Sequence, residues 1–464
     1  MNPDLHSLVT PPLAVARAAS RYSCTDDTDS PNPPARPARA STERALSAPR
    51  QRGAAALLVT LLLFVAMALG ALFVNRNLVF EQRAATNQYR STQAFEAAEA
   101  GIEWALAQLN DNGRLGPDCR PANDPTATSF RARYLAFNRA DASFTPRTWV
   151  QNGASTALQP SCVRSATGWV CSCPTQGLPA LSAVPIASPA PAFTLQFQPG
   201  DKPGTVRVAA IGCTSLAGEC LPGATASADA SARIEAAFGL LAALRTPPAA
   251  ALTTRGTADA GSAALGAHNP DPGTGLAIHA GGAVLAGQAR LSGPAGSPLA
   301  GSLIGNDTAL AQLSPDRFFA SHFGLAKAAW KAQATVTRIQ CPSDCGATLT
   351  QAIDDAGANP MIWIDGDLPL AGPLSLGTAQ HPALIVVDGV ARLDGALAIH
   401  GVLYAGDLIW NHASAAAVLR GALLSEGNYQ GSAAAELFYD TAVLATLKGN
   451  TGSFARINGS WRDF

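Results

Sequence analysis

The sequence predicts an α+β fold in which one long N-terminal helix is followed by a β-rich part with features of a β-solenoid. Three observations support this prediction. Residues 53–74 contain no charged side chain, helical periodicity continues to Leu109, and short apolar strands ending in glycine recur after residue 247. A chain of 464 residues has room for a membrane element and one large or two smaller globular parts.

The uncharged segment 54–74 is long enough to cross a bilayer, because roughly 20 apolar residues span its hydrocarbon core. The arginines closest before it are Arg36, Arg39, Arg44, Arg50 and Arg52. The positive-inside rule therefore places residues 1–53 in the cytoplasm and the remainder in the periplasm, as a single-pass protein of the inner membrane. Residues 1–53 are rich in Pro, Ser and Arg and lack apolar periodicity, so we expect a disordered leader.

The helix is predicted to continue beyond the membrane, so that it covers residues 54–110. Phe95, Ala98, Ile102 and Leu109 recur at helical spacing, and glutamates occupy the opposite face. The sequence Asn110-Asp-Asn-Gly113 then predicts the end of the helix, because Asn and Gly accept the left-handed conformation that ends helices.

Two β-rich regions are predicted after the helix, at 111–246 and 247–464, with Pro247-Pro248 at the boundary. In the first region, alternation predicts strands at 194–198 and 205–211. In the second, the repeated sequence Leu-Ala-Ile-His at 276–279 and 397–400 favours a solenoid of stacked strands, with an ordinary sandwich as the alternative. One helix is predicted at 314–332, with Ser314 as its N-cap and Pro315 at its first position.

Eight of the nine cysteines follow the membrane segment, and an even number suits a disulfide framework in an oxidising periplasm. Cys213 with Cys220 and Cys341 with Cys345 close short loops, so these pairs are candidate disulfides. The spacings Cys171-x-Cys173 and Cys341-x₃-Cys345 also match half of a zinc site. Because the exported part offers few histidine partners, we favour disulfides.

Charge and motifs argue against several classes of function. The net charge is −1 and 14% of the residues are charged, which gives no basic footprint for nucleic acid. The seven histidines show no metal-ligand spacing, and we expect no metal, no cofactor and no catalytic residue.

The most enzyme-like residues are four aspartates of the second β-rich region, Asp365, Asp367, Asp388 and Asp394. Clustered carboxylates on a solenoid face can cleave polysaccharide, so a membrane-anchored, polysaccharide-active β-solenoid enzyme is the alternative to a non-enzymatic protein. Each aspartate lies at or near a glycine, however, and we favour a role in turn geometry.

Residues 50–110 resemble the N-terminal region of the PilX family, the minor pilin-like subunits of type IV pilus assembly. The resemblance lies in Arg50-Gln-Arg-Gly-Ala-Ala-Ala-Leu-Leu, in Phe80-Glu-Gln-Arg-Ala-Ala and in Gln93-Ala-Phe-Glu-Ala-Ala-Glu-Ala-Gly-Ile-Glu. It implies that prepilin peptidase cleaves after Gly53 and leaves Ala54 as the first, N-methylated residue. It also implies a non-enzymatic minor pilin that moves from the inner membrane into a pilus at the cell surface, with major and minor pilins as partners. A pilus-tip adhesin is a further alternative.

The resemblance further implies that the apolar helix leaves the bilayer and packs against helices of other pilins in the fibre. The contacts that we expect are made by Leu58, Phe64, Phe73, Phe80, Phe95 and Ile102. Major pilins carry glutamate at the fifth mature position, which is Leu58 here. Leucine at this position fits a priming or tip-located subunit better than a repeating one.

Overall fold

The computed structural model describes residues 52–181, 190–216, 218–223, 227–260, 265–411, 417–432 and 434–463. The chain divides into two units, Met1–Asn75 and Arg76–Phe464. The predicted disorder of the leader concerns residues 1–51, which lie outside the described residues.

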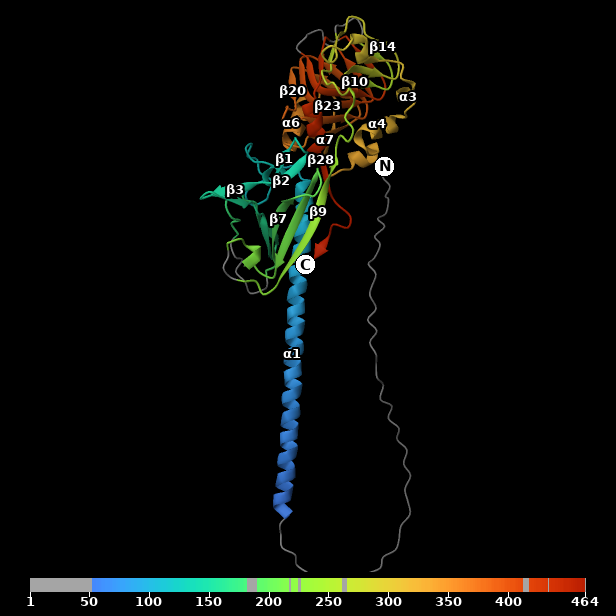
Figure 1. The fold of residues 1–464 in the computed structure, drawn as a ribbon. Coiled ribbons are helices and arrows are strands. Elements are labelled where there is room, and N and C mark those ends of the chain that lie inside the picture. Colours follow the sequence, from blue (N-terminus) through green and yellow to red (C-terminus); the bar gives the residue numbers. More distant parts are fainter. Residues whose placement is uncertain are drawn as a thin grey trace, which may run out of the picture. The chain divides into compact units, whose positions relative to one another are not determined.

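The predicted N-terminal helix is confirmed as α1 (Arg52–Leu109), which ends one residue before the end of the predicted range 54–110. It contains the one candidate membrane span, by length and composition, in the described part of the chain. The β-rich remainder, drawn from green to red in Figure 1, confirms the predicted α+β class.

The first β-rich region forms a seven-stranded antiparallel sheet with the strand order β28-β9-β8-β7-β5-β6, in which β29 also pairs with β9. Its strands are β5 (Ser161–Ser165), β6 (Gly168–Ser172), β7 (Ala192–Pro199), β8 (Thr205–Cys213), β9 (Ser231–Ala242), β28 (Gly452–Arg456) and β29 (Arg462–Asp463). The last two strands come from the C-terminus, so the expected division at residue 246 needs correction. The chain leaves this sheet after β9 and returns to it at β28, which pairs antiparallel with β9.

Short elements surround this sheet. They are α2 (Phe130–Tyr134), the hairpins β1 (Leu135–Asn138) with β2 (Ser143–Pro146) and β3 (Thr148–Gln151) with β4 (Ala154–Ala157), and the 3₁₀ turn η1 (Gly218–Cys220).

The second β-rich region is a solenoid of parallel strands, as predicted, with three faces. The first face contains β17 (Val336–Gln340), β18 (Met361–Asp365), β21 (Ala383–Val387), β23 (Leu397–Ala405), β25 (Val418–Ser425), β10 (Ala250–Thr254), β13 (Leu276–Ala280) and β16 (Leu303–Ile304). The second face contains β19 (Leu368–Ala371), β22 (Val390–Asp394), β24 (Asp407–Trp410), β26 (Tyr429–Gly431), β11 (Ala258–Asp259) and β14 (Val284–Leu285).

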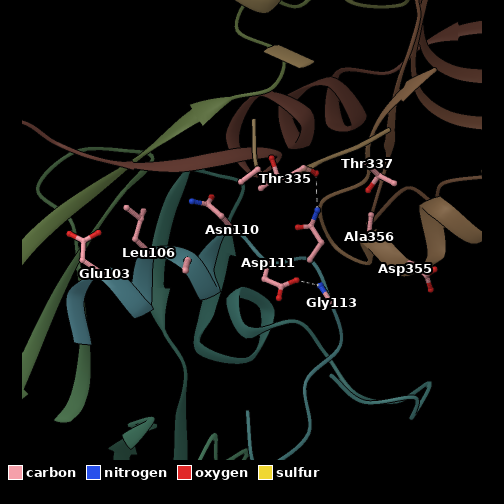
Figure 2. A pocket seen from close by; sticks show the side chains of 12 residues that line it. Glu103, Leu106, Asn110, Asp111, Gly113, Thr335, Thr337, Asp355 and Ala356 are labelled. Carbon is pink, nitrogen blue, oxygen red and sulfur yellow. Dashed lines mark hydrogen bonds between the residues drawn. The ribbon is translucent and has the colours of Figure 1, made fainter. Parts of the chain in front are cut away.

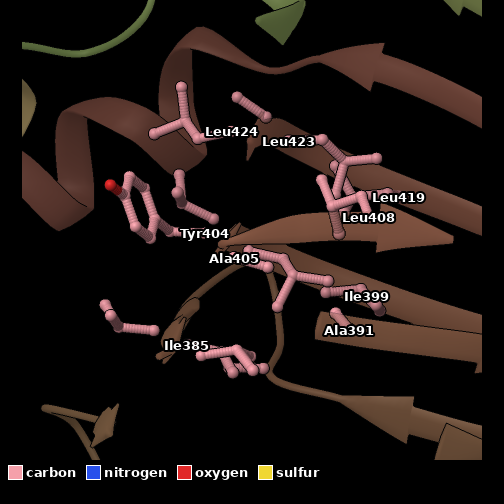
Figure 3. Packing of buried hydrophobic residues seen from close by; sticks show 14 of the residues in the cluster. Ile385, Ala391, Ile399, Tyr404, Ala405, Leu408, Leu419, Leu423 and Leu424 are labelled. Atoms are coloured by element: carbon pink, nitrogen blue, oxygen red, sulfur yellow. The ribbon is translucent and has the colours of Figure 1, made fainter. Parts of the chain in front are cut away.

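The third face contains β20 (Leu374–Leu376), β27 (Glu436–Tyr439), β12 (Gly266–His268) and β15 (Arg290–Ser292), together with the first residues of β23 and β25. Strands β23 and β25 are long enough to run through both the third and the first face. Figure 3 shows apolar side chains from several coils, among them Ile399, Leu408 and Leu423, meeting inside the solenoid. Each coil therefore buries the apolar surface of its neighbours.

The coils do not stack in the order of the sequence. Strand β10 pairs with β25 on one side and with β13 on the other, so residues 250–304 extend the end of the solenoid that residues 418–431 form. The two Leu-Ala-Ile-His segments are also not equivalent. The register aligns Ile278 through Leu252 and Leu423 with Leu403, and it places Ile399 on the third face.

Helices connect and cover the coils. They are α3 (Thr308–Ala311), α4 (Pro315–Phe323), α5 (Lys327–Lys331), α6 (Gly346–Ala356) and α7 (Thr441–Gly449), with a 3₁₀ turn η2 (Leu299–Ser302). The single helix predicted at 314–332 is thus corrected to two helices. Gly324 ends α4 with a φ of 74°, a left-handed conformation that glycine adopts without steric cost.

Helices α4 and α5 cover the outer side of the first face through aromatic side chains. The ring of Phe319 lies 5.1 Å from that of Tyr404, and the ring of Trp330 lies 6.0 Å from that of Trp363. This cover explains why residues 422–425 of β25 are all buried, whereas the part of β25 on the third face alternates between buried and accessible residues.

Candidate assembly site

The N-terminal part of α1 carries an exposed apolar surface. The exposed large apolar side chains of α1 include Leu57, Leu58, Leu61, Leu62, Phe64, Met67, Leu69, Leu72, Phe73, Leu78 and Phe80. Leu58 is 60% and Phe64 is 72% exposed, and no charge occurs between Arg52 and Arg76. Apolar surface of this extent is unfavourable in water at about 25 cal/mol per Å², so it must be covered by lipid or by other protein.

The C-terminal part of α1 is covered by the chain's own antiparallel sheet. Small residues let the two backbones approach closely. A Cβ placed on Gly212 of β8 would lie 2.1 Å from the Ala94 carbonyl oxygen and 2.3 Å from the Ala98 nitrogen, and a Cβ on Gly101 would lie 3.1 Å from the Cβ of Ala210. These small residues stand at helical spacing in the sequence, but only the structure shows what they meet.

Exposure along α1 separates the six expected fibre contacts into two groups. Leu58, Phe64, Phe73 and Phe80 are exposed. Ile102 is 1% exposed in the core of the antiparallel sheet, and Phe95 is partly buried against the same core, so these two side chains are corrected to contacts within the subunit. Gly53 and Ala54, the expected processing residues, lie within α1.

The eight cysteines that follow α1 form four disulfides. The pairs are Cys119–Cys173, Cys162–Cys171, Cys213–Cys220 and Cys341–Cys345. The last two are the pairs named from the sequence. Because every cysteine of the two candidate zinc half-sites is bonded to another cysteine, neither spacing is available to a metal. The described residues contain no group of three or more His, Cys, Asp or Glu side chains that could hold a metal ion.

The residues predicted to end α1 also join the antiparallel sheet to the solenoid. Asn110 donates from Nδ2 to the Phe454 carbonyl (2.9 Å), and its Oδ1 accepts from the Phe454 nitrogen (2.7 Å). Asn112 donates to the Thr335 carbonyl (3.0 Å), and Asn359 donates to Asn112 Oδ1 (3.2 Å). Amides with both donors and acceptors satisfied fix the orientation of the parts that they connect.

Buried Arg131 strengthens the same junction. Its guanidinium donates to the Gly452 carbonyl (3.0 Å) and lies 4.8 Å from the centre of the Phe454 ring. Burial lowers the pKa of Arg131 to about 9, because the charged form loses its hydration.

A pocket of about 660 Å³ lies beside this junction, as Figure 2 shows. Glu103 and Leu106 of α1 line one side, and Thr337 and Asp355 line the other. Glu103 is paired with Arg456 (3.1 Å), and Asp111 accepts from the Gly113 nitrogen (2.8 Å). Two carboxylates that line this pocket, those of Glu103 and Asp111, therefore already have an ion-pair or hydrogen-bond partner within the chain.

The aspartates of the polysaccharide alternative make structural interactions. Asp365 pairs with Lys331 and with Arg338 (2.9 Å), and it accepts from the indole of Trp363 (3.0 Å). Asp367 accepts from the Val390 nitrogen of the next coil (2.9 Å), as a turn residue would. Asp388 lies 3.9 Å from Lys327, and Asp394 is also engaged.

Asp365→Asn is expected to remove an acid-sensitive contribution to stability. Hydrogen bonding by Lys331, followed by that of Arg338 and Trp363, lowers the pKa of Asp365 from 3.8 to about 2. A carboxyl whose pKa is lowered by folding stabilises the protein above its unfolded pKa, and the contribution is lost as pH falls through about 4 to 2. We expect a loss of about 1–2 kcal/mol at pH 7, allowing for the exposure of Arg338.

Thermal unfolding followed at pH 7 and at pH 2.5 checks this prediction. The difference between Asp365→Asn and the unmodified protein should shrink at the lower pH. An equal difference at both pH values would contradict the assigned ion pairs. Asp463→Asn, at an exposed position, serves as the control.

Comparisons with known proteins bear on α1. Residues 52–103 match the family described as PilX N-terminal, so the resemblance seen in the sequence is confirmed over this segment. The competence-associated pilin ComZ from Thermus thermophilus is 12% identical, with a TM-score of 0.22 over 81% of this chain and 97% of that one. A TM-score this low does not establish a shared arrangement. No curated protein matches the chain.

Proposed function

We propose that this protein is a minor pilin-like subunit that takes part in the assembly of a type IV pilus or a related pseudopilus. The observation that supports the proposal most directly is the division of α1. Its N-terminal part exposes an uncharged apolar surface within the PilX N-terminal match. Its C-terminal part packs against the subunit's own antiparallel sheet and contributes side chains to the core between them.

In this proposal, residues 54–74 first span the inner membrane with the rest of the chain in the periplasm. The helix then moves into the fibre, where side chains such as Leu58, Phe64, Phe73 and Phe80 contact helices of major and minor pilins. Lipid tails and apolar helices offer similar surroundings to these side chains, so the transfer costs little free energy. The antiparallel sheet and the solenoid remain outside the helical core and contact neighbouring subunits.

Prepilin peptidase is the proposed processing enzyme. When the full-length chain is produced in cells that contain the peptidase, we expect mass spectrometry to find an N-terminus at methylated Ala54. Gly53→Val should leave the precursor uncleaved. The substitution replaces the hydrogen atom on the Cα of residue 53, directly before the cleaved bond, with a β-branched side chain. An intact Met1 in the unmodified protein would refute the proposed processing.

Gly70→Ala provides the matched control for this experiment. Gly70 belongs to the same helix, and a Cβ added there would meet no atom within 4 Å. We expect Gly70→Ala to be processed like the unmodified protein. Loss of processing in both variants would indicate a failure of membrane insertion instead.

Two other functions predict different results. A polysaccharide-active enzyme should lose glycan cleavage when Asp365 and Asp388 are substituted together, whereas the proposed pilin role requires pilus assembly and no glycan turnover. A pilus-tip adhesin should, when deleted, leave pili assembled and abolish surface binding. Counting pili by electron microscopy in a deletion strain separates the assembly role from the adhesin.

A further inference from the structure

Three neighbouring strands on the third face of the solenoid bring a serine, a histidine and a glutamate together. Strand β12 lies between β27 and β15, and the register places His268 opposite Ser292 on one side and Phe438 on the other. Outward-facing residues in register on adjacent strands lie roughly 5 Å apart. The three side chains come from positions 268, 292 and 436, which are too far apart in the sequence to form a local motif.

The hydrogen bonds join these side chains in series. His268 Nδ1 lies 2.8 Å from Ser292 Oγ, and His268 Nε2 lies 2.7 Å from Glu436 Oε2. The other carboxylate oxygen of Glu436 pairs with Arg290. The ring of Phe438 stacks on the imidazole at 4.8 Å and 22°, which holds the plane of the ring.

We propose that Ser292, His268 and Glu436 form a nucleophile–base–acid triad that hydrolyses carboxylic esters. The pattern required for such a site is a nucleophile bonded to a base that a third group orients. Here the Nε2–H of His268 donates to Glu436, so Nδ1 keeps the lone pair that can accept the proton of Ser292. The two ring nitrogens exchange the roles that they have in the familiar proteases.

The backbone leaves room for this arrangement at Gly266. A Cβ at this position would lie 1.8 Å from Glu436 Oε2 and 2.8 Å from His268 Nε2, so any other residue would push the carboxylate away from the imidazole. The glycine makes no turn here, since it lies in β12. Its lack of a side chain is therefore explained by the space that the Glu436–His268 contact occupies.

The reaction balances with water as the only second reactant. Ser292 Oγ bonds to the ester carbonyl carbon while its proton passes to His268 Nδ1. The tetrahedral intermediate collapses, the bond to the leaving oxygen breaks, and that oxygen takes the proton from His268. Water then attacks the acyl–Ser292 ester with His268 as the base, releasing the carboxylic acid and restoring the Ser292 hydroxyl.

The position of Ser292 fits attack on an external ester. Strand β15 is the end strand of its sheet, and Ser292 is partly exposed. The next residue is Gly293, whose backbone N–H makes no hydrogen bond with any residue that the structure describes. An N–H directly after the nucleophile is a common donor to the developing oxyanion. A single donor of this kind favours esters, whose leaving groups are good, over amides.

A purely structural reading of the same residues is a stack along the solenoid. His400, Arg420, Phe438, His268 and Ser292 occupy one register on successive strands, and the Arg420 guanidinium lies 4.8 Å from the Phe438 ring centre. A stack would stabilise the coils without any reaction at Ser292. The two readings therefore differ in the reactivity of one hydroxyl group.

The test uses the purified full-length chain in detergent. Labelling with a fluorophosphonate probe, followed by peptide mass spectrometry, is expected to find the adduct on Ser292. Hydrolysis of p-nitrophenyl acetate should fall about 100-fold in Ser292→Ala and in His268→Gln, since a positioned base contributes about 10²–10⁴-fold. Gly266→Ala keeps all three side chains and should also lower the rate, because it displaces Glu436.

Ser297→Ala is the matched control, because Ser297 is an exposed serine five residues further along. It should label and hydrolyse like the unmodified chain. The melting temperature of every variant is measured by circular dichroism. If His268→Gln has a lower melting temperature than the unmodified chain, the test rests on Ser292→Ala, which removes only one oxygen atom. An adduct elsewhere, or an unchanged rate in Ser292→Ala, would reduce the three residues to a structural stack and overturn the proposal.

Discussion

Gly212→Ala is expected to separate α1 from the antiparallel sheet. The added Cβ would lie 2.1 Å from the Ala94 carbonyl oxygen and 2.9 Å from the Ala98 Cα, and these are backbone atoms that cannot rotate away. The helix must move, which disturbs the packing of Ile102 and of the other core residues beneath it. We expect a loss of about 3 kcal/mol in the free energy of unfolding, at the upper end for an overpacked core.

Gly239→Ala is the matched control for this substitution. Gly239 lies in the neighbouring strand β9, and its Cβ would be 3.4 Å from the side chain of Ile457, an ordinary contact. We expect its stability to remain within about 0.5 kcal/mol of the unmodified protein. Thermal unfolding and limited proteolysis at the end of α1 measure both variants. Equal stability of the two would contradict the close approach between α1 and β8.

Lys327→Met is expected to leave a buried carboxylate without its cation. The Glu426 side chain is 10% exposed, and it pairs with Lys327 and accepts a hydrogen bond from the Tyr404 hydroxyl. Burial, followed by the charge of Glu426, raises the pKa of Tyr404, so the phenol remains a donor. Removing one partner of a buried ion pair costs about 3–5 kcal/mol, because the remaining charge is uncompensated.

Unfolding monitored by tryptophan fluorescence measures this loss, since Trp330 belongs to α5 and its ring lies 6.0 Å from that of Trp363. Lys448→Met, on the exposed side of α7, is the control and should change stability by less than about 0.5 kcal/mol. The double variant Lys327→Met with Glu426→Gln should recover part of the loss, because the buried carboxylate of Glu426 is then no longer present as an unpaired charge. A single variant as stable as the control would show that the pair contributes nothing.

Local signals in the sequence predicted the elements that depend on local physics. The uncharged run from Gly53 and the periodicity through Ile102 predicted α1 and placed its end within one residue of Leu109, because helix formation follows from side chains three and four positions apart. Seven- and four-residue separations made Cys213–Cys220 and Cys341–Cys345 candidates, since short loops restrict their partners. The parallel solenoid could be expected from short apolar strands with glycine turns.

Contacts between distant residues were beyond the reach of these signals. Periodicity showed that Ile102 was apolar, but the nearby sheet decided that it packs inside the subunit while Leu58 stays exposed. The Leu-Ala-Ile-His repeat suggested equivalent coils, yet the register of the strands placed the two copies on different faces. A repeat of four residues does not specify which strand each copy pairs with.

The sequence by itself therefore determined the long helix, its apolar surface, the β-rich remainder and the family resemblance of residues 52–103. The tertiary structure decided the return of β28 to β9, the stacking of β10 on β25, and the meeting of Ser292, His268 and Glu436. The physical reason is that helix formation and short disulfide loops depend on neighbours along the chain. Sheet register and stacking depend on pairing energies between segments more than 100 residues apart, which become definite only when the whole core packs.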